Sequence, residues 1–212
     1  MEKLRDFGVI PLRYSVISSL LQSYKDPKNK VRMMEKSGQL IRLKKGLYVV
    51  SPKISKQNLS KNLISNHLYG PSYVSLESAL SYYGLIPERT VDTYAITSGR
   101  KKHFETPLGH FHYIGLPSQY FAIGIRLQTH NDEYAFLIAS PEKALCDFII
   151  TRAGLRFQSK KAIKKFILED IRFDNQNMAG WDISIIDQCI EAGYKKKELK
   201  LLKEYIKDEN CI

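Results

Sequence analysis

The chain has few of the features that mark secreted, membrane-spanning or metal-cluster proteins. Its 212 residues include three cysteines, Cys146, Cys189 and Cys211, which are far apart and form no CxxC pair. We expect reduced thiols, and neither a disulfide framework nor a zinc cluster. No apolar run approaches the roughly 18–20 residues that span a bilayer, and the charged N-terminus has no apolar signal core. We therefore expect a cytoplasmic protein with no membrane partner.

The sequence also lacks the motifs of phosphate chemistry and covalent catalysis. The segment 97–102 has one Gly and not the P-loop spacing. We interpret Arg100, Lys101 and Lys102 as an exposed basic loop that could be a second nucleic-acid contact. No nucleophile lies in a recognisable elbow. Glu77 and Glu142 fall in the first turns of expected helices, where the helix dipole accounts for an acid, and we assign Glu88 a structural role too. We predict no enzymatic activity and no cofactor.

Three histidines need separate consideration as metal ligands. His110 and His112 would lie on one face of a strand, with His103 opposite across a turn. Three imidazoles could hold a metal in principle. However, the pattern offers no acidic or cysteine partner at a ligand spacing, and exposed histidines on a hairpin are common. We therefore predict no metal site.

Positive charge is concentrated in the first quarter of the chain. Residues 1–56 contain nine Lys and four Arg against two Asp and two Glu, so they carry nine of the eleven excess positive charges of the whole chain. A basic module on a nearly neutral body is the electrostatic pattern of a protein that places one face on a polyanion. The alternative is a basic surface that serves only solubility.

The pattern of the first 56 residues predicts a winged helix-turn-helix. Apolar spacing predicts a helix over Pro11–Leu21. Asp26 before Pro27 predicts the start of a second helix, Pro27–Lys36, and Gly38 is a suitable left-handed residue after its end. Two alternating segments, 39–43 and 47–50, flank a turn with Gly46 and predict a hairpin.

This arrangement predicts binding to double-stranded DNA. The second helix would enter the major groove, where Asn29 and Arg32 are the candidates for reading base edges, because their side chains make paired hydrogen bonds to adenine and guanine. The other predicted DNA-binding residues would neutralise phosphates. These are Lys28, Lys30, Lys36, Arg42, Lys44 and Lys45. The alternative is a winged helix that docks a protein, with its basic residues only solvated.

The sequence pattern of residues 57–212 predicts a mixed α and β domain with a helical C-terminal end. A helix capped by Ser75 and ended by Gly84 precedes the expected strands. Apolar runs and turn signals predict strands over 93–97, 103–106, 109–114 and 134–139. Further helices are expected over 141–152, 160–169, 183–192 and 195–207. The predicted fold class is therefore α+β, with a DNA-binding domain over 1–56 and a second domain over 57–212.

Four blocks of the sequence together resemble a known family. They are Leu40–Tyr48 in the hairpin, Pro71–Leu80 (PSYVSLESAL), Tyr83–Glu88 (YGLIPE) and Ala139–Asp147 (ASPEKALCD). In order and spacing they are similar to AbiEi-type antitoxins, also described as predicted transcriptional regulators of viral defence systems. The resemblance covers roughly residues 10–155, and the helices after it match more loosely.

The resemblance implies a bacterial protein with two roles in a type IV toxin–antitoxin system. The winged helix would bind the protein's own promoter and repress it, and the larger domain would counter a nucleotidyltransferase-like toxin without a stable complex. The stretch before Pro11 is short for the family's first helix, so the helical core is expected to be completed differently. Two alternatives stay open: a plain winged-helix transcription factor without a toxin partner, and a nucleic-acid-processing enzyme whose winged helix delivers substrate.

Overall fold

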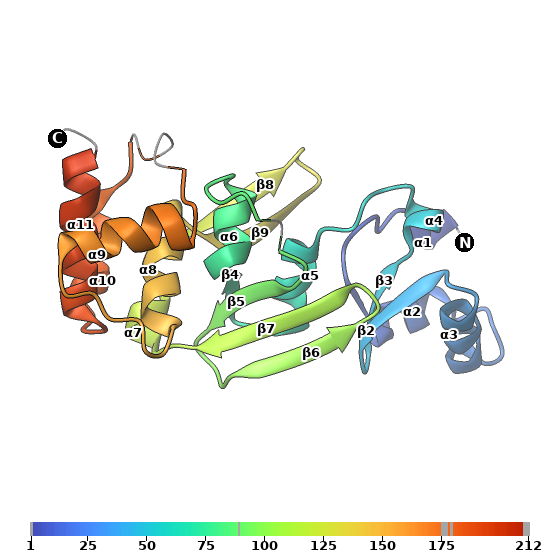
Figure 1. The fold of residues 1–212 in the computed structure, drawn as a ribbon. Helices are drawn as coiled ribbons and strands as arrows, with labels where there is room; N and C mark the ends of the chain where they lie inside the picture. Colours follow the sequence, from blue (N-terminus) through green and yellow to red (C-terminus); the bar gives the residue numbers. More distant parts are fainter. Residues whose placement is uncertain (1, 89, 175–177, 179, 210–212) are drawn as a thin grey trace.

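Two sheets organise the chain, a small one near the N-terminus and a larger one in the middle, with helices packed around both (Figure 1). The structure, a computed structural model, describes residues 2–88, 90–174, 178 and 180–209. The elements of the N-terminal part are α1 (Glu2–Arg5), β1 (Leu12–Arg13), α2 (Tyr14–Leu20), α3 (Pro27–Lys36), β2 (Leu40–Lys44), β3 (Leu47–Val50) and α4 (Pro52–Ser55).

Helix α3 has the boundaries that the sequence predicts, and its ends show why. The Asp26 carboxylate accepts a hydrogen bond from the Asn29 backbone N–H at 2.9 Å, and Pro27 occupies the first turn. At the other end Gly38 has φ +69°, and the Gln39 N–H donates to the Met34 carbonyl. This is the Schellman arrangement that a glycine after a helix allows.

The first predicted helix is shorter than expected. Leu12 and Arg13 are extended and pair with Tyr48 and Leu47 of β3, so α2 begins only at Tyr14. Apolar spacing alone did not predict this, because the strand pairing is formed with a segment more than thirty residues away. The short α1 places Leu4 in the same small core as α2 and α3.

The larger sheet has six strands in the order β6-β7-β5-β4-β9-β8, with parallel and antiparallel pairs. Strands β5 and β9 match the predicted ranges, and β4 and β8 were not predicted. The helix predicted to begin at Ser75 is α6, but the Ser75 hydroxyl does not cap it. The elements are α5 (Lys61–Leu68), β4 (Ser72–Val74), α6 (Leu76–Tyr82), β5 (Thr93–Thr97), β6 (Lys102–Thr106), β7 (Gly109–Gly115), α7 (Ser118–Phe121), β8 (Ile125–His130) and β9 (Tyr134–Ala139).

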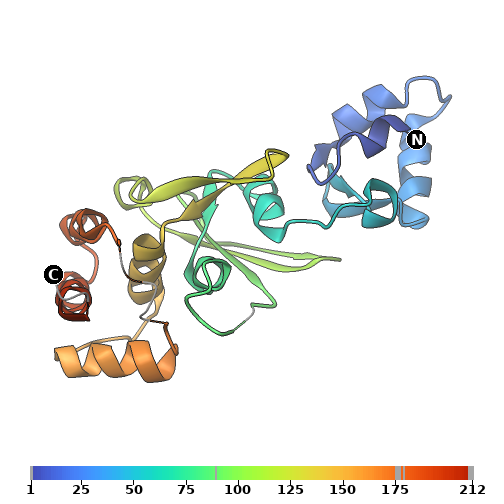
Figure 2. The same cartoon turned by 90° about the horizontal axis from the view of Figure 1, so that it is seen from above.

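The C-terminal end is helical, as predicted. It lies at the opposite end of the molecule from α2 and α3 (Figure 2). Helix α9 continues into a single π-helical turn, η1, within the predicted helix 160–169. Helix α11 packs against α10, α9 and α8, and α10 packs against α8. The elements are α8 (Pro141–Thr151), α9 (Lys160–Lys165), η1 (Phe166–Asp170), α10 (Ile183–Glu191) and α11 (Lys196–Glu209). Among the described residues, no helix has the length and apolar character needed to cross a membrane.

A buried polar cluster lies between the large sheet and α8. Asp147 lies 3.1 Å from the Lys143 Nζ, and neither side chain is exposed. The Asp147 Oδ2 also accepts hydrogen bonds from Tyr73 at 3.0 Å and from Ser75 at 2.7 Å. Ser75 therefore holds α8 rather than capping its own helix. The Lys143 Nζ also donates to the Tyr120 carbonyl at 3.0 Å, while the Asp147 Oδ1 has the ammonium as its ion-pair partner and accepts no hydrogen bond from the described residues. Each buried charge is therefore compensated by the opposite charge of its partner.

The N-terminal part and the large sheet share a hydrophobic cluster. Leu43, Leu47 and Val49 of the β2–β3 hairpin pack with Ile64 and Leu68 of α5 and with buried residues of β5 and β7. The turn between β6 and β7 lies beside β2 (Figure 1). We call this contact the junction cluster. It buries one side of the hairpin and leaves the other side facing α3.

Candidate nucleic-acid interface

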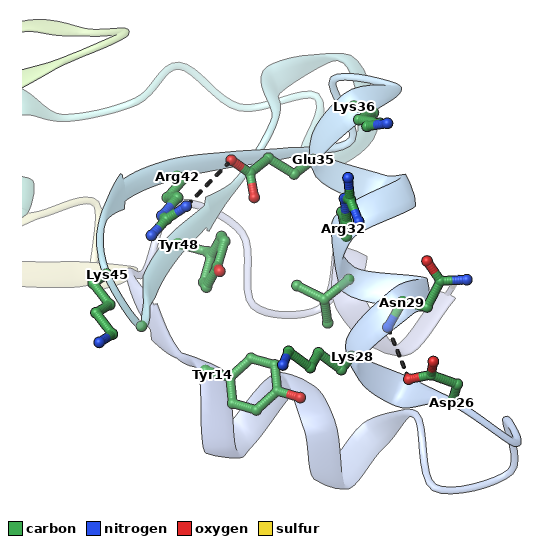
Figure 3. A pocket seen from close by; sticks show the side chains of 12 residues that line it. Tyr14, Asp26, Lys28, Asn29, Arg32, Glu35, Lys36, Arg42, Lys45 and Tyr48 are labelled. Atoms are coloured by element: carbon green, nitrogen blue, oxygen red, sulfur yellow. Dashed lines mark hydrogen bonds and ion pairs between the residues drawn. The ribbon is translucent and has the colours of Figure 1, made fainter.

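Helix α3 and the β2–β3 hairpin enclose an open concave surface of about 1070 Å³ (Figure 3). We call it the α3–hairpin concavity. It contains Lys28, Asn29, Arg32, Lys36, Arg42 and Lys45, which are six of the eight residues predicted to bind DNA. The remaining lining residues are Tyr14, Asp26, Val31, Glu35, Gly46 and Tyr48.

The concavity is basic. Its lining holds five Lys and Arg side chains against two acidic ones, Asp26 and Glu35. Asp26 is engaged at the start of α3, where it caps the Asn29 N–H. Glu35 lies 4.0 Å from the Arg42 guanidinium, and both side chains are partly exposed, so this pair is weak and easily screened by salt. The excess positive charge is therefore available to an anionic ligand.

Helix α3 presents its polar side chains because of its apolar spacing. Val31 and Met34 are buried in the N-terminal core, which fixes the rotation of the helix. Lys28, Arg32 and Lys36 are each separated by one helical turn, so they lie on one exposed face. Asn29 and Arg32 are both exposed, and Figure 3 shows the Asn29 side chain on the side of α3 away from the hairpin.

The hairpin supplies the opposite wall. Arg42 lies on β2 and pairs across the ladder with Tyr48 of β3, while Lys45 and Gly46 form the turn. Gly46 has φ +79°, a conformation that this turn requires and glycine adopts without cost. Tyr14, at the start of α2, completes the lining and was not predicted. Its position depends on the pairing of β1 with β3, which brings Tyr14 N–H to the Gly46 carbonyl at 2.9 Å.

Lys30 and Lys44 lie elsewhere. The Lys30 Nζ lies over the Tyr24 ring, 4.9 Å from its centroid. The Lys44 Nζ donates to the Leu68 carbonyl and lies 5.6 Å from the centroid of Phe104. Burial lowers the pKa of Lys44, and repulsion by Arg13 and Lys102 lowers it further. Lys44 is thus a residue of the junction and not of the concavity.

A β-bulge explains the position of Lys44. The register shifts between Arg42 and Lys44, so that Lys44 pairs with Leu47 while Arg42 pairs with Tyr48. Strict alternation would place Arg42 and Lys44 on the same face. The extra residue breaks the alternation and re-aims the side chain that follows it. The bulge therefore separates two basic residues that the sequence pattern places together.

The three glutamates considered for acid–base catalysis and the basic segment 100–102 lie outside the concavity, each with its own neighbours. Glu77 pairs with Arg152, Glu88 pairs with Arg172, and the buried Glu142 accepts a hydrogen bond from the Asp182 N–H at 2.9 Å. Each carboxylate therefore has a distinct partner within the described residues. Arg100 and Lys101 are exposed between β5 and β6, whereas Lys102, also exposed, is the first residue of β6, so the basic loop is shorter than interpreted.

One statement from the sequence about the histidines is corrected by the structure. The His103, Glu105 and His110 side chains each place one ligand atom within 4.8 Å of the others. The acidic partner that the sequence pattern did not reveal is Glu105. It lies on the same strand as His103 and directly opposite His110 in the ladder.

Comparison with known proteins identifies the fold but no family. The sequence matches no protein-family model and no curated protein. The structure is similar to the crystal structure of the RV2827C protein from Mycobacterium tuberculosis, with a TM-score of 0.53 and 12% sequence identity. The match covers 95% of this chain and 78% of that chain. At this identity the similarity shows a shared fold only.

Proposed function

We propose that residues 1–56 form a winged helix-turn-helix that binds double-stranded DNA. The observation that carries the proposal is the convergence of Lys28, Asn29, Arg32, Lys36, Arg42 and Lys45 on one basic concave surface. Helices α2 and α3 followed by the β2–β3 hairpin have the chain order of such a module. The major groove, about 12 Å wide, admits a helix about 10–12 Å in diameter.

The proposed contacts differ in what they contribute. Asn29 and Arg32 are exposed polar residues of α3 whose side chains can make paired hydrogen bonds to bases, so they are assigned to base edges. Lys28, Lys36, Arg42 and Lys45 are assigned to phosphates, which position the protein and supply the salt-dependent part of affinity. Lys30 and Lys44 have no assigned contact, because their ammonium groups lie against Tyr24 and at the junction.

We further propose that the protein represses its own promoter and acts as an antitoxin toward a nucleotidyltransferase-like toxin. The support is the resemblance of its sequence blocks to AbiEi-type antitoxins. Three of these blocks meet in one core: Tyr73 and Ser75 bond to Asp147, and the Tyr83 hydroxyl donates to the Ala139 carbonyl at 3.0 Å. The blocks therefore specify a scaffold, and we assign antagonism of the toxin to the exposed surface around that scaffold.

The test of DNA binding is fluorescence anisotropy on a duplex taken from upstream of the protein's own gene. A scrambled duplex of the same composition is the control, and both are titrated across a salt series. We expect tighter binding to the native duplex at every salt concentration. Equal, steeply salt-dependent binding to both duplexes would reduce the concavity to a non-specific basic patch and would contradict autorepression.

The test of the antitoxin role starts from the neighbouring gene. A nucleotidyltransferase-like reading frame beside this gene would be expressed with and without the protein, and with its Arg32→Ala variant. We expect growth to be restored by both forms, because antagonism is assigned to the larger domain. Failure of the wild-type protein to restore growth, or the absence of such a gene, would favour a plain transcription factor.

A further inference from the structure

The outward face of the β6–β7 hairpin carries a square of four polar side chains. In the antiparallel ladder His103 lies opposite His112, and Glu105 lies opposite His110. Residues two apart on a strand share a face, so all four side chains lie on the same side. The alternate residues, Phe104, Phe111 and Tyr113, pack in or against the junction cluster. This hairpin face has no part in the proposed DNA interface.

Three of these side chains have the spacing of metal ligands. One ligand atom each from His103, Glu105 and His110 lies within 4.8 Å of the others. The His103 Nε2 and the Glu105 Oε1 are 3.4 Å apart. Tetrahedral zinc with bonds of about 2.0–2.1 Å requires ligand atoms roughly 3.3 Å apart. The side chains are exposed, so small rotations can bring His110 to the same separation.

A chain of hydrogen bonds from Asp92 through His112 orients the His103 ring. The His112 Nε2 lies 2.9 Å from the Asp92 Oδ2, and its Nδ1 lies 3.2 Å from the His103 Nδ1. The carboxylate accepts from His112 Nε2–H, which leaves the His112 Nδ1 as the acceptor for His103 Nδ1–H. This tautomer follows from the hydrogen-bond network. In the neutral ring this tautomer leaves a lone pair on the His103 Nε2, 3.4 Å from the Glu105 Oε1, whereas a protonated ring donates from Nε2 to that carboxylate.

Asp92 and His112 are themselves held in place. The Asp92 carbonyl accepts from the Ser78 hydroxyl of α6 at 3.4 Å, and the His112 ring stacks on Tyr94 at 4.9 Å. Carboxylate–histidine chains of this kind fix the ring and raise the basicity of metal-ligating histidines. When the His103 ring is neutral, its Nε2 lone pair and the Glu105 carboxylate oxygen face each other across 3.4 Å. A cation between them would make that arrangement favourable.

We propose that His103, Glu105 and His110 bind one divalent transition-metal ion of the zinc class. Two imidazoles and one carboxylate suit such ions, whereas Mg²⁺ and Ca²⁺ prefer all-oxygen sites. Three protein ligands leave a fourth position for water or another ligand. Asp92 and His112 are positioning residues. The ion would join β6, an edge strand of the large sheet, to β7.

The test is titration of untagged protein with Zn²⁺ by isothermal calorimetry, with Co²⁺ absorption as a second readout. We expect one equivalent to bind, and tetrahedral Co²⁺ bands to appear and be displaced by Zn²⁺. His110→Ala and Glu105→Gln should each weaken binding at least tenfold. Asp92→Asn should weaken it by about 10–100-fold, the range for residues that orient a ligand. Millimolar Mg²⁺ should not compete.

His130→Ala is the matched control, because His130 is an exposed histidine on another strand of the same sheet, β8. Its affinity for Zn²⁺ should equal that of the wild type. Circular dichroism checks the fold of each variant, and histidine side-chain NMR of the wild-type protein gives a readout that needs no variant. Absence of saturable Zn²⁺ binding, or unchanged binding in both ligand variants, would overturn the site.

Discussion

Arg32 and Lys30 are two residues apart on α3 but have different surroundings. Arg32 is exposed in the concavity, while the Lys30 ammonium lies over Tyr24. We expect Arg32→Ala to reduce the preference for the native duplex by about 1–3 kcal/mol, because a bidentate base contact is lost. Lys30→Ala removes the same charge and should leave this preference unchanged. Anisotropy on native and scrambled duplexes measures both, and equal losses on the two duplexes would exclude base reading by Arg32.

Lys143 and Asp147 are fully buried partners within α8. We expect Lys143→Met to reduce the free energy of unfolding by about 3–5 kcal/mol, because it leaves a buried carboxylate without its cation. Replacing both residues, as Lys143→Met with Asp147→Leu, should recover much of that loss. Urea denaturation followed by circular dichroism tests this. A double variant no more stable than the single one would show that Asp147 is needed mainly for Tyr73 and Ser75.

Ionisation of the Tyr83 hydroxyl makes the free energy of unfolding depend on pH in the alkaline range. Burial raises its pKa to about 12 from the usual 10, and its hydroxyl donates to the Ala139 carbonyl at 3.0 Å. As the pH rises above 10, Tyr83 loses its hydroxyl proton in the unfolded chain before it does so in the folded chain. The contribution of Tyr83 to the free energy of unfolding is therefore complete below pH 10 and is lost as the pH rises toward 12.

We expect Tyr83→Phe to be less stable than the wild type by about 0.5–1.5 kcal/mol at pH 9, because it lacks one partly buried hydrogen bond. The difference should narrow as the pH rises to 11. Urea denaturation at pH 9, 10 and 11 measures it. A difference that stays constant over this range would show that Tyr83 does not contribute to the pH dependence.

At the scale of elements, the sequence predicts the helices and strands that are specified by neighbouring residues, such as capping residues and apolar runs. Asp26, Pro27 and Gly38 bound α3, and the apolar runs 93–97 and 134–139 are β5 and β9. The unpredicted strands rely on distant partners. Strand β8 is an edge strand whose Leu127 is 68% exposed, so it shows no buried apolar face. Strand β1 exists because β3 pairs with it.

The residues of the candidate sites also fall into two groups: those whose position follows from local sequence and those whose position depends on a distant segment. Lys28, Arg32 and Lys36 lie on one exposed face because their spacing is fixed within α3, so their exposure follows from local sequence. The position of Lys44 depends on a bulge, and the association of Glu105 with His110 depends on the hairpin register. Neither a bulge nor a cross-strand register can be derived from apolar alternation in one strand. Tyr14 enters the concavity only through the β1–β3 pairing.

At the scale of the whole molecule, the junction cluster couples the N-terminal part to the large sheet. Leu43 is buried there among residues of both parts. We expect the wild-type protein to unfold in one calorimetric transition. Leu43→Ala should cost about 2–5 kcal/mol through lost contacts and a cavity, and should separate the transition into two.

Leu127→Ala is the control for this substitution, because an exposed leucine contributes within about 0.5 kcal/mol. It should leave the single transition unchanged. Two transitions in the wild-type protein would show that the parts unfold independently and that the junction cluster contributes little coupling.

The most direct measurement of DNA binding by the concavity is an NMR titration of the full ¹⁵N-labelled chain with the native upstream duplex. We predict that the amide signals that change first and most belong to α3 and to the β2–β3 turn, including Asn29, Arg32 and Lys45. Signals of α10 and α11, at the other end of the molecule, should remain unchanged. Changes confined to the C-terminal helices, or none at saturating duplex, would contradict the assignment of the α3–hairpin concavity as the DNA-binding site.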